Sequence, residues 1–162
     1  MQNHLTPLGI KVEQAKLDII EPQADTVQEV ARSKAKQAYS ILRKPLIVED
    51  GAFVIDELNG FPGPYIKFIL KSLGVERLLK FSKIVKSKSC RFLDSVVFVN
   101  SKGKFKAFND DFYRGNLASR LDQTSNPEIW SDLWRIVIPV GSRKPLSAMT
   151  YVERQEVEKS FH

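Results

Sequence analysis

The sequence predicts a single α/β domain in which an elongated, mixed β-sheet is flanked by helices. Three observations favour this fold: one long segment with helical spacing, several apolar runs of strand length, and two apolar runs joined by a short polar turn. The chain has 162 residues, of which 43% are hydrophobic and 27% are charged. Because it contains no internal repeat or linker, we expect one domain over residues 1–162.

The N-terminal part of the chain predicts one strand followed by one helix. Residues 9–17 alternate loosely between apolar and polar side chains, which is typical of a half-buried strand. Thr26 and Glu29 form a capping-box pattern, and apolar residues then keep helical spacing until Lys44-Pro45. We therefore expect a helix between the capping box and the proline.

An acidic pair separates two short apolar runs in the middle of the chain. Residues 46–48 and 53–55 read as buried strands, and Glu49-Asp50 follows the first of them. The glycine and proline residues of segment 59–64 predict a loop, because proline fixes φ and glycine adopts conformations that other residues resist. We therefore expect the two acids at the C-terminal end of a strand.

The remaining predicted elements are two helices, a β-hairpin, two further strands and a terminal helix. In chain order they are helices over 65–73 and 75–81, a hairpin of 92–99 and 105–108 around the turn 101–104, a strand near Phe112, a strand over 136–138, and a helix after the capping-box pair Thr150 and Glu153.

The charge balance favours a phosphate-bearing partner. Lys and Arg number 25 against 19 Asp and Glu, which gives a net charge of +6. Diffuse positive charge attracts any polyanion, so it does not separate a nucleotide from a nucleic acid, and a solvated basic surface without a ligand is the alternative. Because the sequence has no RNA- or DNA-binding motif, we do not expect a nucleic-acid partner.

Membrane and redox signals are absent from the sequence. It has no run of about eighteen apolar residues and no signal-peptide pattern, so we expect a cytoplasmic protein with no membrane partner. Cys90 is the only cysteine, which excludes an internal disulfide and a cysteine-rich metal site. We assign Cys90 no catalytic role.

Lys34 lies in the middle of the apolar stripe of the first predicted helix, whereas Lys36 points to the opposite side. An uncompensated buried charge is costly, so Lys34 is expected to meet an anion. That anion is either a carboxylate, Glu49 or Asp50, or a phosphate of a ligand. The alternative is a lysine at the edge of the stripe whose amine reaches water.

The acidic pair predicts a site for a hard divalent cation. Mg²⁺ takes oxygen ligands and often uses one or two carboxylates together with substrate phosphates. Neighbouring side chains on a strand point in opposite directions, so only one of Glu49 and Asp50 need face the site. Glu21, just ahead of the first predicted helix, could supply a third carboxylate.

The segment Ile47 to Asp50 and the segment Leu58 to Phe68 together resemble the signature of the inosine triphosphate pyrophosphatase (Ham1-like) family. The spacing between the acidic pair and the Phe-Pro-Gly loop is that of the family. The resemblance implies an elongated α/β fold, usually a homodimer, that cleaves noncanonical purine nucleoside triphosphates (ITP, dITP, XTP) to the monophosphate and pyrophosphate with Mg²⁺.

The resemblance also implies roles for four residues. Asp50 matches the carboxylate that activates the attacking water, and Glu49 matches its acidic neighbour. Glu21 matches a metal-binding acid, so that Glu21, Glu49 and Asp50 are the implied metal ligands, and Lys34 matches a lysine that contacts phosphate. The chemistry is coherent, because a metal neutralises phosphate charge while a carboxylate orients the water.

Other parts of the sequence depart from the family pattern. Members normally begin with a strand, a Thr-Gly-Asn-x-x-Lys loop and a helix, so we expect a fold that lacks the family's first strand and helix. Trp130 and Asp132 fall where the family recognises the purine, in a different order, and Lys144 falls at a substrate-binding lysine. Three functions stay open: the pyrophosphatase, a catalytically inactive ITPase-like module that senses nucleotides or binds a protein, and, supported by the positive charge alone, a module that associates with nucleic acid.

Overall fold

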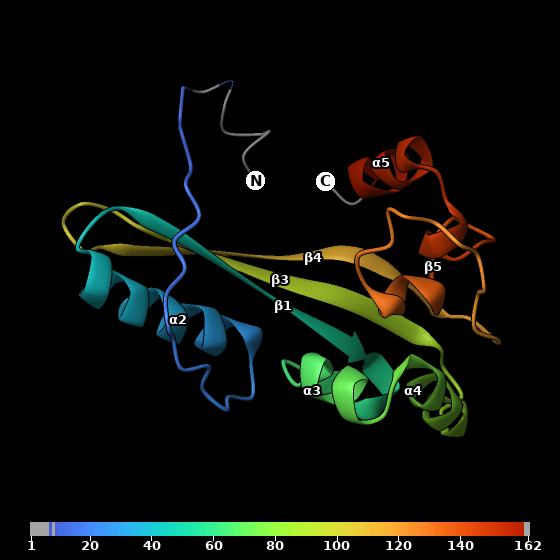
Figure 1. Ribbon diagram of the computed structural model, residues 1–162. Helices are drawn as coiled ribbons and strands as arrows, with labels where there is room; N and C mark the ends of the chain where they lie inside the picture. Colours follow the sequence, from blue (N-terminus) through green and yellow to red (C-terminus); the bar gives the residue numbers. More distant parts are fainter. Residues whose placement is uncertain (1–6, 8, 161–162) are drawn as a thin grey trace.

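The computed structural model describes residue 7 and residues 9–160, and it is built around one five-stranded sheet in the order β2-β1-β3-β4-β5 (Figure 1). The strands are β1 (Leu46–Ile55), β2 (Pro62–Gly63), β3 (Ser89–Val99), β4 (Phe105–Leu117) and β5 (Val137–Pro139). The α-helices are α2 (Val27–Leu42), α3 (Ile66–Ser72), α4 (Val75–Phe81) and α5 (Tyr151–Lys159). Short 3₁₀ helices cover Asp56–Leu58, Ser82–Ile84, Asp132–Arg135 and Leu146–Ala148.

The predicted α/β fold is confirmed, and the molecule is elongated along β1, β3 and β4, with α2 near one end of these strands and α3, α4 and α5 near the other (Figure 1). The sheet differs from the prediction in one respect, since each described strand pair is antiparallel rather than mixed. A parallel pair needs a crossover connection that lets the second strand run in the same direction as the first. No two neighbouring strands of the described chain run in the same direction.

Helix α2 forms where its local signals place it. The Thr26 side chain accepts a hydrogen bond from the Glu29 amide, and the Glu29 carboxylate accepts one from the Thr26 amide, so the predicted capping box is confirmed. The apolar stripe of the helix is buried against β1 and β3. A small core cluster results, in which Ala31 and Ala35 of the helix pack with Val97 and Val99 of β3.

The hairpin of β3 and β4 is longer than predicted. Asn100 closes its turn by accepting hydrogen bonds from the amides of Lys102 and Lys104. The separate strand expected near Phe112 is wrong, because β4 runs on without a break. A shift in register at Phe92 and Leu93 leaves Phe112 as an extra residue, and such a bulge lets a strand continue past an irregular position.

Two further predictions about strands are wrong. Residues 46–55 form one strand rather than two, because Gly51 keeps an extended backbone, and the acidic pair therefore lies in the middle of β1. Residues 9–17 form no strand and pair with no strand among the described residues. The chain beyond them is held to α2, where the Gln37 side chain bonds both the amide and the carbonyl of Ile20 at 3.0 and 2.7 Å.

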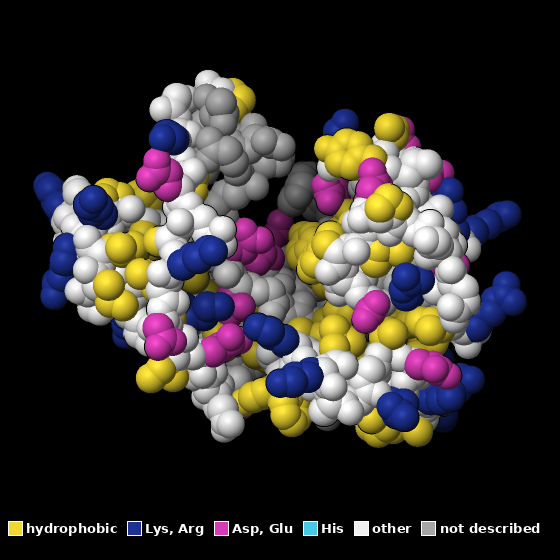
Figure 2. All heavy atoms as spheres, viewed as in Figure 1, with side chains coloured by type: hydrophobic (Ala, Val, Ile, Leu, Met, Phe, Trp, Pro, Cys, Tyr) yellow, Lys and Arg dark blue, Asp and Glu magenta, His cyan; other side chains and the backbone are white. Residues whose placement is uncertain are grey.

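The larger core cluster lies at the other end of the sheet. Phe53, Phe92 and Tyr113 project from the three long strands into it, and Trp134 and Leu146 cover it from the 3₁₀ helices Asp132–Arg135 and Leu146–Ala148. Figure 2 shows a hollow in the middle of one face of the molecule, beside the end that carries α5, with acidic side chains inside it.

Candidate active site

A cavity of about 690 Å³ lies beside the middle of β1. Its wall is formed by β1 from Glu49 to Phe53, by one face of α3, by β3 around Asp94, and by the loop that leads to the 3₁₀ helix at Asp132. The cavity therefore combines carboxylates from the sheet, a lysine from α3 and aromatic rings from the loop. The part of the wall that carries chemistry consists of Glu49, Asp50, Lys67, Asp94, Phe112 and Trp130.

Lys34 and Asp50 form an ion pair at this site. The Lys34 Nζ lies 3.3 Å from the Asp50 Oδ1, and the two side chains are 24% and 17% exposed. The prediction that Lys34 meets a carboxylate is confirmed, and the partner is Asp50. Burial raises the pKa of the Asp50 carboxyl above its ordinary value, and the neighbouring Lys34 ammonium offsets part of that rise.

Glu49 faces the other side of the sheet, towards Asp94 of β3. Burial raises the pKa of Asp94 to about 6, with a further contribution from the negative charge of Glu49. Asp94, which pairs across the strands with Gly51, is a site residue that the sequence does not predict. Its only signal was a single acid inside an apolar run, and nothing local places that acid next to β1.

Glu49 and Asp50 can line one cavity because an edge of β1 is open beside them. The Ile55 amide donates to the Phe61 carbonyl on the β2 side. In a strand, the backbone N–H and C=O groups of every second residue point to the same side. The backbone groups of Glu49 and Gly51 therefore point to that same side, where β2 pairs only with Phe53 and Val54. No other strand of the described chain pairs with this edge.

The donor set suits a Mg²⁺ ion that is shared with a substrate. Within residues 9–160, no three His, Cys, Asp or Glu side chains gather as a ligand set of their own. Mg²⁺ usually keeps water ligands and is held by one or two carboxylates together with phosphates. Glu49 and Asp50 meet that need. Glu21 lines an adjacent cavity. Its negative charge contributes to the raised pKa of Asp50, after the larger effect of burial.

The three remaining predicted site residues lie in different surroundings. Trp130 lines the cavity, is 68% exposed, and packs edge to face on Trp134 at a centroid distance of 5.7 Å. Asp132 does not line it and pairs with Arg135 at 3.7 Å. Lys144 also lies away from it, with its Nζ 2.7 and 2.9 Å from the two carboxylate oxygens of Glu153.

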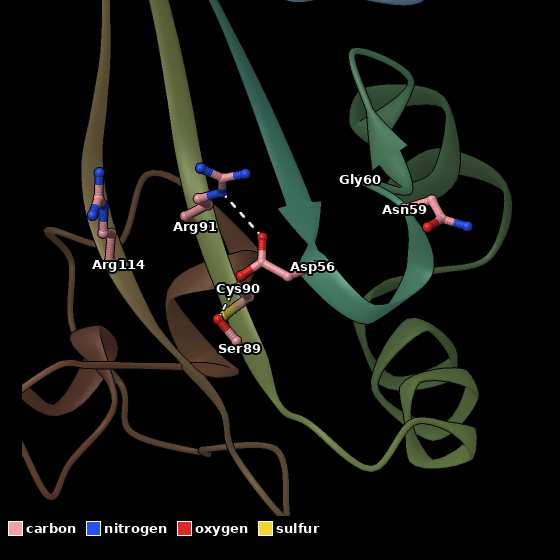
Figure 3. Close-up of a pocket in the computed structure, with 7 residues that line it drawn as sticks. All are labelled: Asp56, Asn59, Gly60, Ser89, Cys90, Arg91 and Arg114. Atoms are coloured by element: carbon pink, nitrogen blue, oxygen red, sulfur yellow. Dashed lines mark hydrogen bonds and ion pairs between the residues drawn. The ribbon is translucent and has the colours of Figure 1, made fainter.

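A second cavity, of about 640 Å³, lies near the end of β1 and contains none of the predicted site residues (Figure 3). Arg91 bridges Asp56 and Asp111 at 3.1 and 2.9 Å, so its charge is already neutralised. Burial raises the pKa of the Cys90 thiol to about 12, which excludes a reactive thiolate there. The cavity beside Asp50 is therefore the better candidate for chemistry.

Comparison with known proteins decides the family. The sequence matches the Ham1 family over residues 1–156. This chain belongs to the Ham1 family. Over 152 residues it is 30% identical to a dITP/XTP pyrophosphatase of Saccharolobus solfataricus, a match that covers 90% of this chain and 73% of the relative. Over 94 residues it is 38% identical to the inosine triphosphate pyrophosphatase of Saccharomyces cerevisiae, covering 57% of this chain and 48% of the relative.

Solved structures confirm the Ham1 fold. A nucleoside-triphosphatase, or dITP/XTP pyrophosphatase, of Mycobacterium abscessus superposes with a TM-score of 0.79 at 14% identity, covering 98% of this chain and 86% of the other. None of the helices formed by the described residues combines the length and apolar character needed to cross a membrane.

Proposed function

We propose that this Ham1 protein hydrolyses noncanonical purine nucleoside triphosphates (ITP, dITP, XTP) to the monophosphate and pyrophosphate, with Mg²⁺ as cofactor. One observation carries the proposal: Asp50, whose Oδ1 lies 3.3 Å from the Lys34 Nζ, lines a cavity of about 690 Å³ that Glu49 and Trp130 also line. The names of the relatives, dITP/XTP and inosine triphosphate pyrophosphatases, support it.

Asp50 is suited to the role of general base. Burial raises the pKa of its carboxyl, which increases its strength as a base, while the Lys34 ammonium lowers that pKa and so favours the ionised form. In this proposal Asp50 orients the attacking water and accepts its proton. In the same proposal the Lys34 ammonium, beside that carboxylate, stabilises the negative charge that grows on the phosphates.

Glu49 and Asp50, with Glu21 from the adjacent cavity, would hold Mg²⁺. The ion would neutralise phosphate charge and lower the pKa of bound water. Asp94 adds a further carboxylate near Glu49. Because its pKa is about 6, Asp94 is ionised at neutral pH and shares the negative charge that draws a cation to this side of the cavity.

Trp130 offers a ring face for the purine. Its side chain is largely exposed at the cavity, and its contact with Trp134 fixes the ring orientation. Asp132 and Lys144 are proposed as further substrate contacts. Each must leave its present partner to reach the cavity, Asp132 from Arg135 and Lys144 from Glu153.

We propose that the protein acts as a homodimer in the cytoplasm. The edge of β1 beside Glu49 to Gly51 pairs with no strand of the described chain. Because unpaired strand edges readily pair with another chain, a second copy of the protein could bind there. Light scattering at micromolar concentration should give twice the chain mass. A monomer under these conditions would contradict the dimer, and recovery in the membrane or secreted fraction would contradict the location.

A pyrophosphate-release assay tests the proposed activity. ITP, dITP and XTP are compared with ATP and GTP, each with Mg²⁺ and with a chelator. We expect release from the first three, only with Mg²⁺, and its loss in Asp50→Asn. Asp18→Asn, a change of the same kind at an exposed position, is the control and should match the wild type. Tight binding of ITP without turnover would instead favour the inactive nucleotide-sensing module.

A further inference from the structure

A cavity of about 550 Å³ lies beside β5, at the edge of the sheet, and is lined by the loop that follows β4 and the loop that follows β5 (Figure 1). It shares no lining residue with the cavity beside Asp50, and none of the roles proposed above uses it. Its volume is within the range of about 300–1,000 Å³ that is usual for small-molecule sites. The side chains that carry its chemistry are those of Ser119, Arg120, Asp122, Gln123, Thr124 and Arg143.

Arg120 and Arg143 bring two positive charges to this cavity from different loops. Both side chains are exposed, so a ligand from solvent can reach them. Neither makes an ion pair or a hydrogen bond with any residue that the structure describes. A guanidinium is planar and presents its N–H donors in a fork that matches the oxygens of a phosphate or a carboxylate. Two such groups without a protein anion therefore favour a ligand with two negative charges.

Asp122 is the one acid among the described residues that line the cavity, and its carboxylate already has partners. It accepts hydrogen bonds from the Ser147 hydroxyl at 2.6 Å and from the Thr124 hydroxyl at 3.1 Å. Burial acts to raise the pKa of Asp122, but these bonds and the nearby charge of Arg135 together lower it. Because Arg135 offsets the charge of Asp122, the two guanidinium groups of the cavity remain uncompensated.

Neutral groups complete the lining of the cavity. The Ser119 hydroxyl and the Gln123 amide group have no hydrogen-bond partner within the described chain, and both can donate to a phosphate oxygen. Leu121, Ile138 and Pro145 are half-buried and give the cavity an apolar wall. A bare ion would leave this wall uncovered, so the lining favours an anion that is attached to an organic group.

We propose that this cavity is a second anion site, in which Arg120 and Arg143 bind the phosphate group of a small organic phosphate ester. Such a phosphate carries a charge of about −1.5 to −2 at pH 7, which matches the two guanidinium groups. A single carboxylate would neutralise only one of them. The inference goes beyond the pyrophosphatase activity and does not depend on it, because none of its residues belongs to the site of Asp50.

An NMR titration with ribose 5-phosphate, a phosphate ester without a purine, tests the site and locates it. The backbone amide signals of residues 119–124 and 143 should shift and reach saturation, with a Kd of about 1 mM or lower. Arg120→Met and Arg143→Met should each weaken binding about tenfold, which is the effect of losing one charge-assisted contact. Arg32→Met, which removes an exposed arginine of α2, is the matched control and should bind as the wild type does. Thermal melting checks that all three variants fold.

Three results would overturn the proposal or one part of it. Shifts confined to the surroundings of Asp50, or equal affinities in the wild type and all three variants, would show that the second site does not exist. Inorganic phosphate should bind more weakly than ribose 5-phosphate because it covers none of the apolar wall, and equal affinity would overturn the role of the organic group. Succinate, which has two carboxylates and no phosphate, should also bind more weakly, and equal affinity would overturn the preference for phosphate.

Discussion

Replacing Lys34 with Met removes the cation from its pair with Asp50 and keeps most of the hydrocarbon stem. At 3.3 Å the pair has a Coulomb energy of about 5 kcal/mol at an effective dielectric constant of about 20, before desolvation is subtracted. Removing one partner costs about 3–5 kcal/mol in a fully buried pair and under about 1 kcal/mol in an exposed one. With both side chains no more than a quarter exposed, we expect a loss of about 1–3 kcal/mol in the free energy of unfolding near pH 7.

The loss should depend on pH in a defined direction. Burial already raises the pKa of Asp50, and without Lys34 that pKa rises further. A raised carboxyl pKa begins to disfavour the folded state as the pH rises above the pKa of the unfolded chain, and the penalty is complete once the pH exceeds the raised pKa of the folded protein. The difference between Lys34→Met and the wild type is therefore largest near neutral pH and shrinks as the pH falls and Asp50 takes up a proton in both proteins.

Urea unfolding of a double-mutant cycle measures the pair directly. The cycle consists of the wild type, Lys34→Met, Asp50→Asn and the double variant, at about pH 7 and again at about pH 4. We expect a coupling free energy of about 1–2 kcal/mol near neutral pH and a smaller one in acid. Additive effects within about 0.5 kcal/mol at neutral pH would refute the reasoning, since independent sites behave in that way.

Three further substitutions test other parts of the structure. Asp94→Asn should raise the free energy of unfolding by about 1 kcal/mol at about pH 8 and change it little near pH 4, because the folding penalty of a carboxyl whose pKa is raised to about 6 builds up as the pH rises from about 4 to about 6. Equal effects at both pH values would contradict this reasoning. Gly115→Ala would place a Cβ 2.3 Å from the Ile138 carbonyl and should lower the melting temperature by several degrees, whereas Gly51→Ala, with its nearest contact at 3.8 Å, is the tolerated control. Thr26→Ala removes the cap of α2 and should cost about 1 kcal/mol in urea unfolding, and a cost near zero would show that the cap contributes nothing.

The elements that the sequence predicts well are those with local signals. The capping box and the apolar spacing lie within α2 itself, so the helix and the buried direction of Lys34 both follow from residues 26–42. The hairpin is equally local, since its turn at Asn100 joins strands that are adjacent in the chain. The pairing of Lys34 with a carboxylate followed from the cost of burying a lone charge.

The features that sequence reasoning misses depend on partners distant in the chain. Residues 9–17 have the alternation of a strand but find no strand partner among the described residues, and alternation alone cannot supply one. Gly51 looks like a break in β1, yet pairing with β3 keeps it extended. Asp94 joins the site because β3 lies beside β1, a neighbour relation that no local pattern encodes.

Turnover of ITP followed by ³¹P NMR, in the wild type beside Asp50→Asn, tests most directly whether the cavity beside β1 is a pyrophosphatase site. With Mg²⁺ present, the wild type should convert ITP to the monophosphate and pyrophosphate, and Asp50→Asn should be slower by about 10²-fold or more. Release of orthophosphate with the diphosphate as the other product, or turnover by Asp50→Asn at the wild-type rate, would contradict the proposed role of Asp50.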